Sequence, residues 1–250
     1  MLLPPQKGVR YVISWQSHED NPVPSRLQER EDVEVHRLEV KGVSANRNNS
    51  LKHCKGDIVL ISDDDVIYHQ DTFKNIIDVH EKDNDLDLAV FKFRYAKEKP
   101  YPSETCELKV PFPKGYYGAA VEITFRREKI GDLKFWPEIG PGNRFLQSGE
   151  DEFFLISALK RGIKAKFINL EIGTHPDLTT GDRLSAGILR GQGFIIYTVY
   201  PLSSILRIPL KAIRLKKQHK VKFLDTIGEL IKGALHAKKI LKKIPKTYRW

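Results

Sequence analysis

Short apolar or alternating runs recur along the first three quarters of the chain and predict β-strands. The predicted strands are residues 9–15, 33–40, 57–62, 86–95 and 165–173. Helices are predicted between them, where segments end at glycine or keep a helical spacing of apolar residues, at 43–56, 72–83 and 151–162. Strands that alternate with helices indicate an α/β domain with a mainly parallel central sheet flanked by helices.

The predicted strand at 57–62 leads into three consecutive carboxylates, Asp63, Asp64 and Asp65, with no basic residue beside them. Because the apolar run is continuous, we expect this strand to be buried on both faces. Ligands of open α/β sheets bind outside the carboxyl ends of strands, where these three side chains fall. If the segment stays extended, Asp63 and Asp65 point to one side and Asp64 to the other.

Three neighbouring carboxylates repel one another, and a divalent cation removes that conflict. Mg²⁺ or Mn²⁺ typically takes one or two carboxylates and shares its other positions with water and substrate phosphates. The alternative is a solvated acidic turn in which Asp64 or Asp65 caps the next helix. A calcium-binding EF-hand loop is excluded, because Tyr68 stands where that loop requires glycine.

Charge is distributed unevenly along the 250 residues, which have an ordinary apolar content of 40% and a net charge of +10. Residues 201–250 contain 14 Lys and Arg against 2 acidic residues, whereas residues 1–200 contain 28 and 30. A nearly neutral body with a basic extension indicates contact with an anionic surface. A nucleic-acid-binding protein would carry interleaved basic and aromatic residues on its body, so no nucleic-acid partner is expected.

Cysteine content and the first residues of the chain bear on the compartment. Cys54 and Cys106 lie far apart in the sequence and fit neither a metal-binding spacing nor a disulfide framework. The N-terminal stretch MLLPPQKGVR lacks the apolar run of a secretory signal. Both observations predict a cytoplasmic protein.

The basic extension also carries apolar residues. Residues 193–213 are apolar but are interrupted by Pro201, Arg207 and Pro209, so an interfacial segment is expected rather than a membrane span. Further on, an apolar stripe of helical period and a set of cations follow: Leu224, Ile227, Ile231, Leu235, Leu241, Lys232, Lys238, Lys239, Lys242 and Lys243. A basic amphipathic helix of this kind lies at the surface of an anionic leaflet. The alternative is a helix that packs on the globular domain and leaves its lysine face solvated.

Three blocks of sequence, in order, resemble family 2 glycosyltransferases of the GT-A fold. The block GVSANRNNSLKHCKGDIVLISDDDVIY resembles the family's core, in which a basic RN helix precedes a strand that ends in a DxD-type metal motif. The block QSGEDEFFLISALKRGIKA resembles the family's GED segment, whose acidic residue opens a helix that bears on the acceptor. The block EIGTHPDLTTGD resembles a segment of bacterial members that build surface polysaccharides. The blocks stand in the family's order, and the resemblance covers roughly residues 8–185.

The resemblance implies a cofactor, Mn²⁺ or Mg²⁺, that bridges the diphosphate of a nucleotide-sugar donor. It makes Asp63 and Asp65 the metal ligands, with Asp65 preferred, and gives Asp64 a contact with the ribose or the sugar. His175 completes the metal site or contacts phosphate. The alternative for His175 is a purely structural role.

The resemblance also implies an inverting reaction, in which a carboxylate takes the proton of the acceptor hydroxyl. The matching residue is Asp151, with Glu150 beside it. The alternative for this acidic cluster is stabilisation of the helix dipole without catalysis. Arg47 and Asn48 match the family's RN, and Arg47 contacts the pyrophosphate or fixes the Asp cluster, unless it is only an exposed helical arginine.

Donor recognition departs from the family pattern. The segments SWQSHED and HRLEVKG stand where most relatives carry PTYN and DDGS runs, so the residue that usually reads the base is missing. Trp15, Gln16 or Asp20 is expected to substitute for it, with Trp15 stacking on the base. Uridine diphosphate is the family's commonest carrier and is the favoured donor nucleotide.

The sequence is therefore interpreted as a GT-A domain at 1–195 followed by a basic amphipathic extension at 196–250. The implied function is transfer of a hexose or N-acetylhexosamine from a UDP-sugar to a saccharide acceptor in capsule, exopolysaccharide or O-antigen synthesis. A lipid-linked acceptor is expected. The expected location is the inner face of the cell membrane. Two alternatives stay open, another metal-dependent phosphoryl-transfer enzyme and a catalytically inactive GT-A partner subunit.

Overall fold

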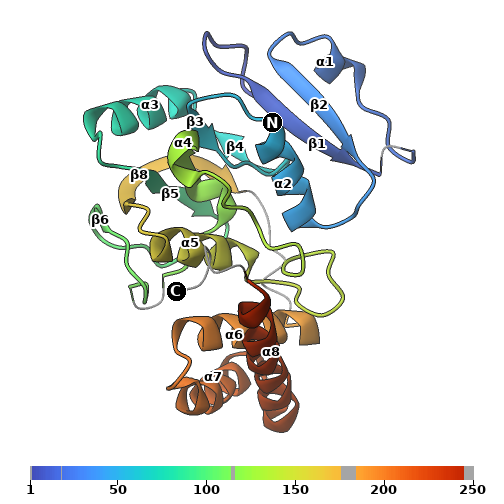
Figure 1. The fold of residues 1–250 in the computed structure, drawn as a ribbon, viewed down its shortest axis with the longest axis vertical. Coiled ribbons are helices and arrows are strands. Elements are labelled where there is room, and N and C mark those ends of the chain that lie inside the picture. Colours follow the sequence, from blue (N-terminus) through green and yellow to red (C-terminus); the bar gives the residue numbers. More distant parts are fainter. Residues whose placement is uncertain (1, 18, 114–115, 176–183, 245–250) are drawn as a thin grey trace. The chain divides into compact units, whose positions relative to one another are not determined.

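A computed structural model describes residues 2–17, 19–113, 116–175 and 184–244 of the chain (Figure 1). The chain divides into two compact units. The first unit comprises Met1–Lys41, Ala45–Lys134 and Gly162–Leu178. The second unit comprises Gly42–Ser44, Phe135–Arg161 and Thr179–Trp250.

The first unit alternates short strands with helices. Its strands are β1 (Tyr11–Gln16), β2 (Val33–Leu38), β3 (Ile58–Leu60), β4 (Ile67–Tyr68), β5 (Leu88–Tyr95), β6 (Cys106–Glu107), β7 (Ile123–Arg126) and β8 (Ala165–His175). Its helices are α1 (Ser25–Gln28), α2 (Val43–His53), α3 (Thr72–Lys82), the 3-10 turn η1 (Ala120–Glu122) and α4 (Arg127–Ile130). The α/β fold class predicted from the sequence is confirmed.

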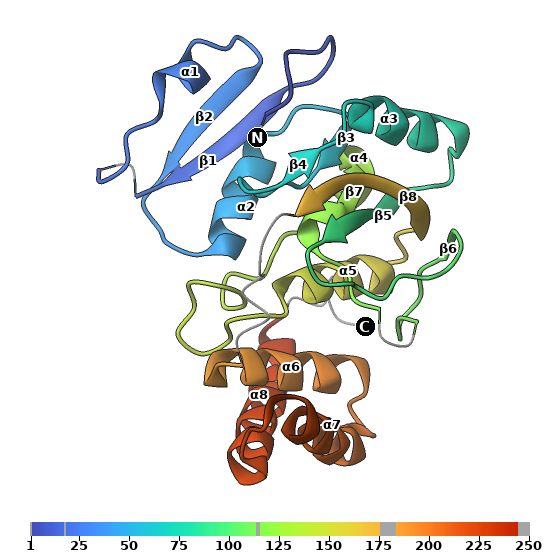
Figure 2. The same ribbon diagram turned by 180° about the vertical axis from the view of Figure 1, so that it is seen from behind.

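The strands of the first unit form two sheets. β1 and β2 pair in parallel, and the larger sheet has the order β3-β7-β5-β8-β4, with β6 pairing β8 outside this path. The parallel pairing of β5 with β8 lies at the centre of the larger sheet, and Figure 2 shows these strands side by side. The pairings of β7 with β3 and β5, and of β8 with β4 and β6, are antiparallel and short. The two longest pairings of the unit are therefore parallel.

Each strand and helix predicted for residues 9–173 is present, with bounds that differ by a few residues. The expected burial of the third strand is wrong. Val59 and Ile61 are buried, whereas Ile58 and Leu60 are only half-buried. The reason is position, because β3 is the first strand in the order of its sheet and pairs there with β7 alone among the described strands.

The core of the first unit lies around β5. Leu88, Ala89, Val90 and Phe91 are all fully buried, and such consecutive burial is typical of a strand covered on both faces. The core cluster consists of Val66, Tyr68, Ile76, Leu86, Ala89, Phe91, Phe93, Val121 and Ile172. Burying each large apolar side chain contributes about 1.5–3 kcal/mol to the free energy of unfolding. This packing fixes the ends of β5 and β8, where the candidate site begins.

The second unit contains α5 (Glu150–Lys160), α6 (Ala186–Val199), α7 (Ser204–His219) and α8 (Phe223–Lys243). Glycines bring α6 and α8 close together, because a Cβ added to Gly193 would collide with the backbone of Leu230, and one added to Gly233 would collide with the backbone of Arg190. Arg190 also donates a hydrogen bond of 2.5 Å from Nε to Glu229 Oε2 across the same pair of helices. The core between α7 and α8 consists of Ile208, Ala212, Leu230 and Ala234.

The apolar segment at 193–213 forms the end of α6 and the first part of α7, with Pro201 between the two helices. A domain boundary at 195/196 would cut α6, which is continuous through Val199 and packs against α8. Within the described ranges, no helix is both long enough and apolar enough to cross a membrane. The apolar residues predicted to form one stripe on α8 lie in two environments. Leu224, Ile231 and Leu235 are exposed, whereas Ile227 packs against the core between α7 and α8.

Candidate active site

The three consecutive carboxylates lie in a turn between β3 and β4 of the first unit. The chain turns at Asp64 and Asp65, and β4 then pairs with β8 so that Ile67 lies opposite Thr174. This register brings Asp65 toward His175, the last residue of β8, and Asp65 Oδ1 lies 3.5 Å from His175 Nε2. The expected extended arrangement is wrong, because the turn directs Asp63 and Asp65 to different partners.

Asp63 contacts Arg47 on helix α2. Arg47 Nη2 donates to both carboxylate oxygens of Asp63, at 3.0 Å and 3.2 Å. The Arg47 side chain is only 10% exposed, so it is not the exposed helical arginine that the sequence left open as an alternative. Asn49 Nδ2 of the same helix donates to Ser14 Oγ of β1 at 2.9 Å, which anchors α2 beside this sheet. Arg47 therefore supplies the positive charge that the sequence around the carboxylates lacks.

His175 is buried at the carboxyl end of β8. Its ring stacks on Tyr95, with centroids 5.5 Å apart, and the two residues are register partners at the ends of parallel strands β5 and β8. The Nδ1 atom is buried and has no hydrogen-bond partner in the described structure. The imidazole is thus held by stacking and by the contact of its Nε2 with Asp65.

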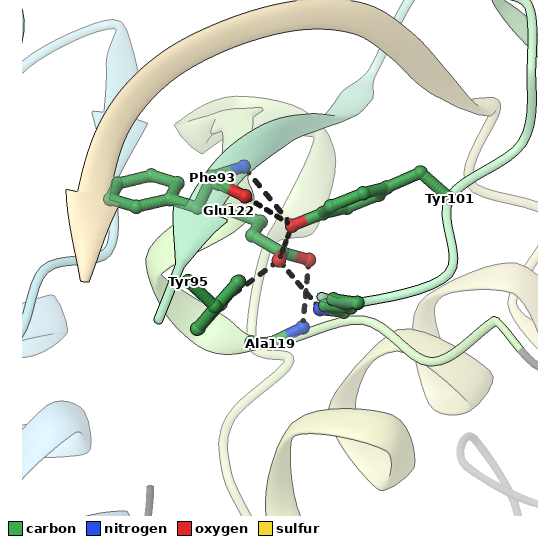
Figure 3. Close-up of polar contacts among 6 residues, drawn as sticks. Phe93, Tyr95, Tyr101, Ala119 and Glu122 are labelled. Carbon is green, nitrogen blue, oxygen red and sulfur yellow. Dashed lines mark hydrogen bonds and ion pairs between the residues drawn. The ribbon is translucent and has the colours of Figure 1, made fainter. Parts of the chain in front are cut away.

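A buried network of hydrogen bonds and one ion pair is centred on Glu122 and includes Tyr95 (Figure 3). Glu122 is fully buried, and its Oε1 accepts hydrogen bonds from the Tyr95 hydroxyl at 3.0 Å and the Tyr101 hydroxyl at 2.5 Å. Lys99 Nζ donates to the same oxygen at 2.5 Å, and the side chain of Lys99 is only 2% exposed. The Ala119 backbone amide donates to Oε2 at 3.1 Å. The carboxylate is therefore paired with a cation and fully hydrogen-bonded, as a buried charge requires.

The tyrosines of this network remain protonated. Burial raises the pKa of Tyr95 well above its usual value, and the negative charge of Glu122 raises it further. The same two causes raise the pKa of Tyr101. Both hydroxyls therefore act as hydrogen-bond donors to Glu122 over the physiological pH range. Sequence reasoning missed this network, because residues 96–122 show no periodic pattern, although tyrosines are dense from residue 95 onward: Tyr95, Tyr101, Tyr116 and Tyr117.

The predicted metal ligands are only partly brought together. In the part of the chain that the structure describes, no group of three or more His, Cys, Asp or Glu side chains is arranged to hold a metal ion. Asp65 and His175 lie together, whereas Asp63 pairs with Arg47. A carboxylate and an imidazole still fit Mn²⁺ or Mg²⁺, because such ions commonly leave several positions to water and substrate phosphates.

The other residues predicted for donor binding lie near strand and helix ends. Trp15 and Gln16 end β1, where Trp15 Nε1 donates to the Asn21 carbonyl and Gln16 Nε2 to the Val40 carbonyl, each at 2.6 Å. Asn48 follows Arg47 on α2 and is half-buried, and Asp64 is exposed in its turn. Because the indole N–H of Trp15 already donates to a backbone carbonyl, Trp15 can contact a base only through stacking on the face of its ring.

The predicted catalytic carboxylates lie in the second unit, at the start of α5. Glu150 is the first residue of the helix and is buried, and a Cβ added to Gly140 would lie 3.0 Å from its side chain. Asp151 follows and is half-buried. The helix is preceded by Gly149 at a φ of 97°, a conformation that favours glycine. Phe154 stacks on Phe135 with centroids 4.4 Å apart, which anchors the first turn.

The third block of the sequence lies mostly outside the described residues. Its histidine, His175, is described, whereas residues 176–182 of the block are not. Cys54 and Cys106 are both free cysteines of intermediate burial. Burial raises the pKa of the Cys54 thiol, which lowers its reactivity.

Comparison with known proteins agrees with the resemblance. Residues 21–135 match the family described as Glycosyl transferase family 2. The matched segment covers just under half of the chain and is similar to family 2 of the glycosyltransferases. It contains Arg47, the three carboxylates and Glu122, so the described contacts of Asp63 and Glu122 lie within the family region. No curated protein matches the chain by sequence.

Solved structures of TarS from S. aureus share the fold. TarS 1-349 aligns with a TM-score of 0.53 and 17% identity, over 84% of this chain and 66% of that chain. The complex of TarS 1-349 with UDP-GlcNAc aligns with a TM-score of 0.55 and 16% identity, over 90% of this chain and 68% of that chain. A longer structure of S. aureus TarS aligns with a TM-score of 0.54 and 18% identity, over 90% of this chain but only 41% of that chain. The chain thus spans about two thirds or less of these proteins, and the likeness shows a GT-A fold.

Proposed function

We propose that this family 2 glycosyltransferase moves a sugar from a nucleoside-diphosphate donor, with UDP favoured, to the hydroxyl of a saccharide acceptor. The observation that carries the proposal is the 3.5 Å approach of Asp65 Oδ1 to His175 Nε2, within and beside the family segment. Two predicted metal ligands from distant parts of the sequence meet there. The TarS structures with UDP and UDP-GlcNAc support the choice of uridine for the donor.

The donor diphosphate would be held by Asp65 and His175 through Mn²⁺ or Mg²⁺, and the ion would neutralise charge on the departing diphosphate. Arg47, with Asp63 as its partner, supplies a fixed positive charge for the pyrophosphate. Trp15 offers its indole face to the base, and Asn48 and Asp64 complete the donor contacts. Each of these residues binds and orients the donor rather than reacting with it.

Asp151 would act as the general base of an inverting transfer. Its carboxylate takes the proton from the acceptor hydroxyl while the oxygen forms a bond to the anomeric carbon. The bond from that carbon to the diphosphate oxygen breaks, and its electron pair leaves with the nucleoside diphosphate. Glu150, buried at the first position of α5, orients the neighbouring carboxylate.

The acceptor is proposed to be a lipid-linked saccharide of a bacterial surface polysaccharide, used at the inner face of the cell membrane. Such an acceptor agrees with the basic residues that gather in the last fifth of the chain. The transferred sugar would be a hexose or an N-acetylhexosamine. A peripheral enzyme would dock where the carrier of its acceptor is anchored.

The test is release of nucleoside diphosphate from a panel of UDP-, GDP-, CDP-, dTDP- and ADP-sugars, with Mn²⁺ or Mg²⁺, in the presence and absence of saccharide acceptors. Acceptor-stimulated release from one donor class is the expected result. Release of inorganic phosphate instead would favour another phosphoryl-transfer enzyme. Tight nucleotide binding with no transfer to any acceptor would favour an inactive partner subunit.

A further inference from the structure

Helix α7 carries apolar side chains on two opposite faces. Its inner face contributes Ile208, Ala212 and Leu215, which are buried. Its outer face carries a stripe spaced by four and three residues, which places the members on one side of the helix. The members and their exposed fractions are Leu206 at 69%, Leu210 at 65% and Ile213 at 44%, and the adjoining Leu202 and Ile205 are 94% and 77% exposed. A solvated helix is expected to be polar on this side.

Positive charge surrounds this stripe. From Ser204 to Lys222 the chain has seven Lys and Arg and no acidic residue. Arg207 and Arg214 lie seven residues apart and therefore flank the stripe on one side, and both are exposed. Arg207 is held in place, because its guanidinium lies 3.5 Å from the ring centre of Tyr200 and its Nε donates to Ser203 Oγ at 3.0 Å.

Helix α8 repeats the pattern. Leu224, Ile231 and Leu235 are exposed at spacings of seven and four residues, so they share a face. The exposed lysines of this helix include Lys232, Lys238 and Lys239. The two helices also enclose a hollow where α7 ends and α8 begins, lined by Ile213, Lys216, Lys217 and Phe223. Ile213 therefore belongs both to the α7 stripe and to the lining of this hollow, beside two lysines.

We infer that the outer face of α7, with Leu202, Ile205, Leu206, Leu210 and Ile213, docks on an anionic lipid bilayer. The apolar side chains would enter the boundary between headgroups and acyl chains while the flanking Lys and Arg meet anionic headgroups. A second copy of the same face is disfavoured as the occupant, because it would bring two sets of cations together. A nucleic acid gains nothing from exposed leucine and isoleucine.

Docking of this face on a bilayer deepens the proposed function and rests on it, because a lipid-linked acceptor is reached at a bilayer. The surface itself is defined by exposure and charge in the second unit, and it contains none of the residues proposed for donor binding or for the base. Docking and sugar transfer can therefore fail independently.

The test is co-sedimentation of the full chain with vesicles of phosphatidylcholine alone and with vesicles containing phosphatidylglycerol. Wild type should sediment with the anionic vesicles. The triple variant Leu206→Ser, Leu210→Ser, Ile213→Ser should have a partition coefficient on anionic vesicles that is lower than that of wild type by at least about tenfold. The reason is that three exposed apolar side chains are lost. The double variant Arg207→Gln, Arg214→Gln should lose much of the preference for anionic vesicles, and added salt should weaken wild-type binding.

A matched control is the double variant Val40→Ser, Ile77→Ser, which removes exposed apolar side chains of the first unit and should sediment like wild type. Wild type that stays in solution with anionic vesicles overturns the inference, as does a triple variant that binds like wild type. Binding of single-stranded RNA without vesicle binding would also overturn it. UDP-induced thermal stabilisation of the triple variant, measured with Mn²⁺, shows whether the donor site is intact and separates the two proposals.

Discussion

The ring of Tyr95 stacks on the imidazole of His175, with centroids 5.5 Å apart and ring planes at 19°. The hydroxyl of the same tyrosine donates to Glu122, which is fully buried and paired with Lys99. A buried ion pair therefore supports, through one tyrosine, the histidine that lies beside Asp65. The carboxyl ends of β5 and β8 carry this arrangement because the two strands run parallel and in register.

Replacing Glu122 with Gln should destabilise the fold. Lys99 would keep its charge at 2% exposure without a carboxylate partner, and breaking a buried pair typically costs about 3–5 kcal/mol. The free energy of unfolding in urea measures the loss. Tyr95→Phe is the matched control, because it removes one hydrogen bond to the same oxygen and should cost only about 1–3 kcal/mol. Equal effects of the two substitutions would show that the ion pair contributes no more than one hydrogen bond.

Replacing Arg47 with Gln should weaken nucleotide binding, and a double-mutant cycle with Asp63→Asn decides how. If Arg47 acts by fixing Asp63, the double variant should bind UDP no more weakly than either single variant. If Arg47 contacts the pyrophosphate itself, its substitution should weaken binding by a similar factor with or without Asp63. Calorimetric titration of UDP in the presence of Mn²⁺ gives the four affinities. Wild-type affinity in both single variants would exclude this pair from the donor site.

Asp151→Asn should reduce the rate of sugar transfer at least about a hundredfold, because general base catalysis typically contributes that much. Affinity for the donor nucleotide should stay within a few fold of wild type. Glu152→Gln removes a carboxylate from the same first turn of α5 and is the control for the helix-dipole alternative. If Asp151→Asn transfers sugar at the wild-type rate, and both variants change the free energy of unfolding by similar small amounts, then Asp151 only stabilises the helix dipole and is not the base.

Stability should fall at acid pH through His80. This residue is fully buried with its Nε2 atom 2.9 Å from Thr124 Oγ1, and burial lowers its pKa to about 4. The unfolded chain binds a proton near the ordinary pKa of 6.5, so between pH 6.5 and 4 the unfolded state holds more protons and is favoured as pH falls. The contribution reaches up to about 3 kcal/mol. Urea unfolding of wild type and His80→Gln across this range should show a shallower pH dependence in the variant.

Much of the first unit follows from local pattern. The alternating and apolar runs give the positions of β1, β2, β3, β5 and β8, and the helices between them appear where glycine and helical spacing indicate. The short strands β4, β6 and β7 were missed, because two to four residues carry no period. The register of β4 on β8 is a tertiary property, and it alone explains why Asp65 meets His175 rather than pointing with Asp63.

The candidate site could be predicted only as far as residue types. The sequence identifies the three carboxylates, Arg47 and His175, but leaves open whether Arg47 contacts the pyrophosphate or fixes the Asp cluster. The structure pairs Arg47 with Asp63, 16 positions further along the chain. The network of Glu122 with Lys99 was missed, since a buried ion pair leaves no periodic trace in sequence. The exposed apolar stripe of α7 was only partly seen, because sequence cannot tell which of two apolar faces packs on α8.

The most direct test of the donor site is the melting temperature of the full chain with UDP, with and without Mn²⁺, in wild type and Asp65→Asn. Ligand in hundredfold excess over Kd adds about 2.7 kcal/mol, which corresponds to a shift of about 5–10 °C for a chain of this size. We predict that UDP raises the melting temperature of wild type only when Mn²⁺ is present, and that Asp65→Asn abolishes the shift. An equal shift without metal, or an undiminished shift in Asp65→Asn, would contradict the account.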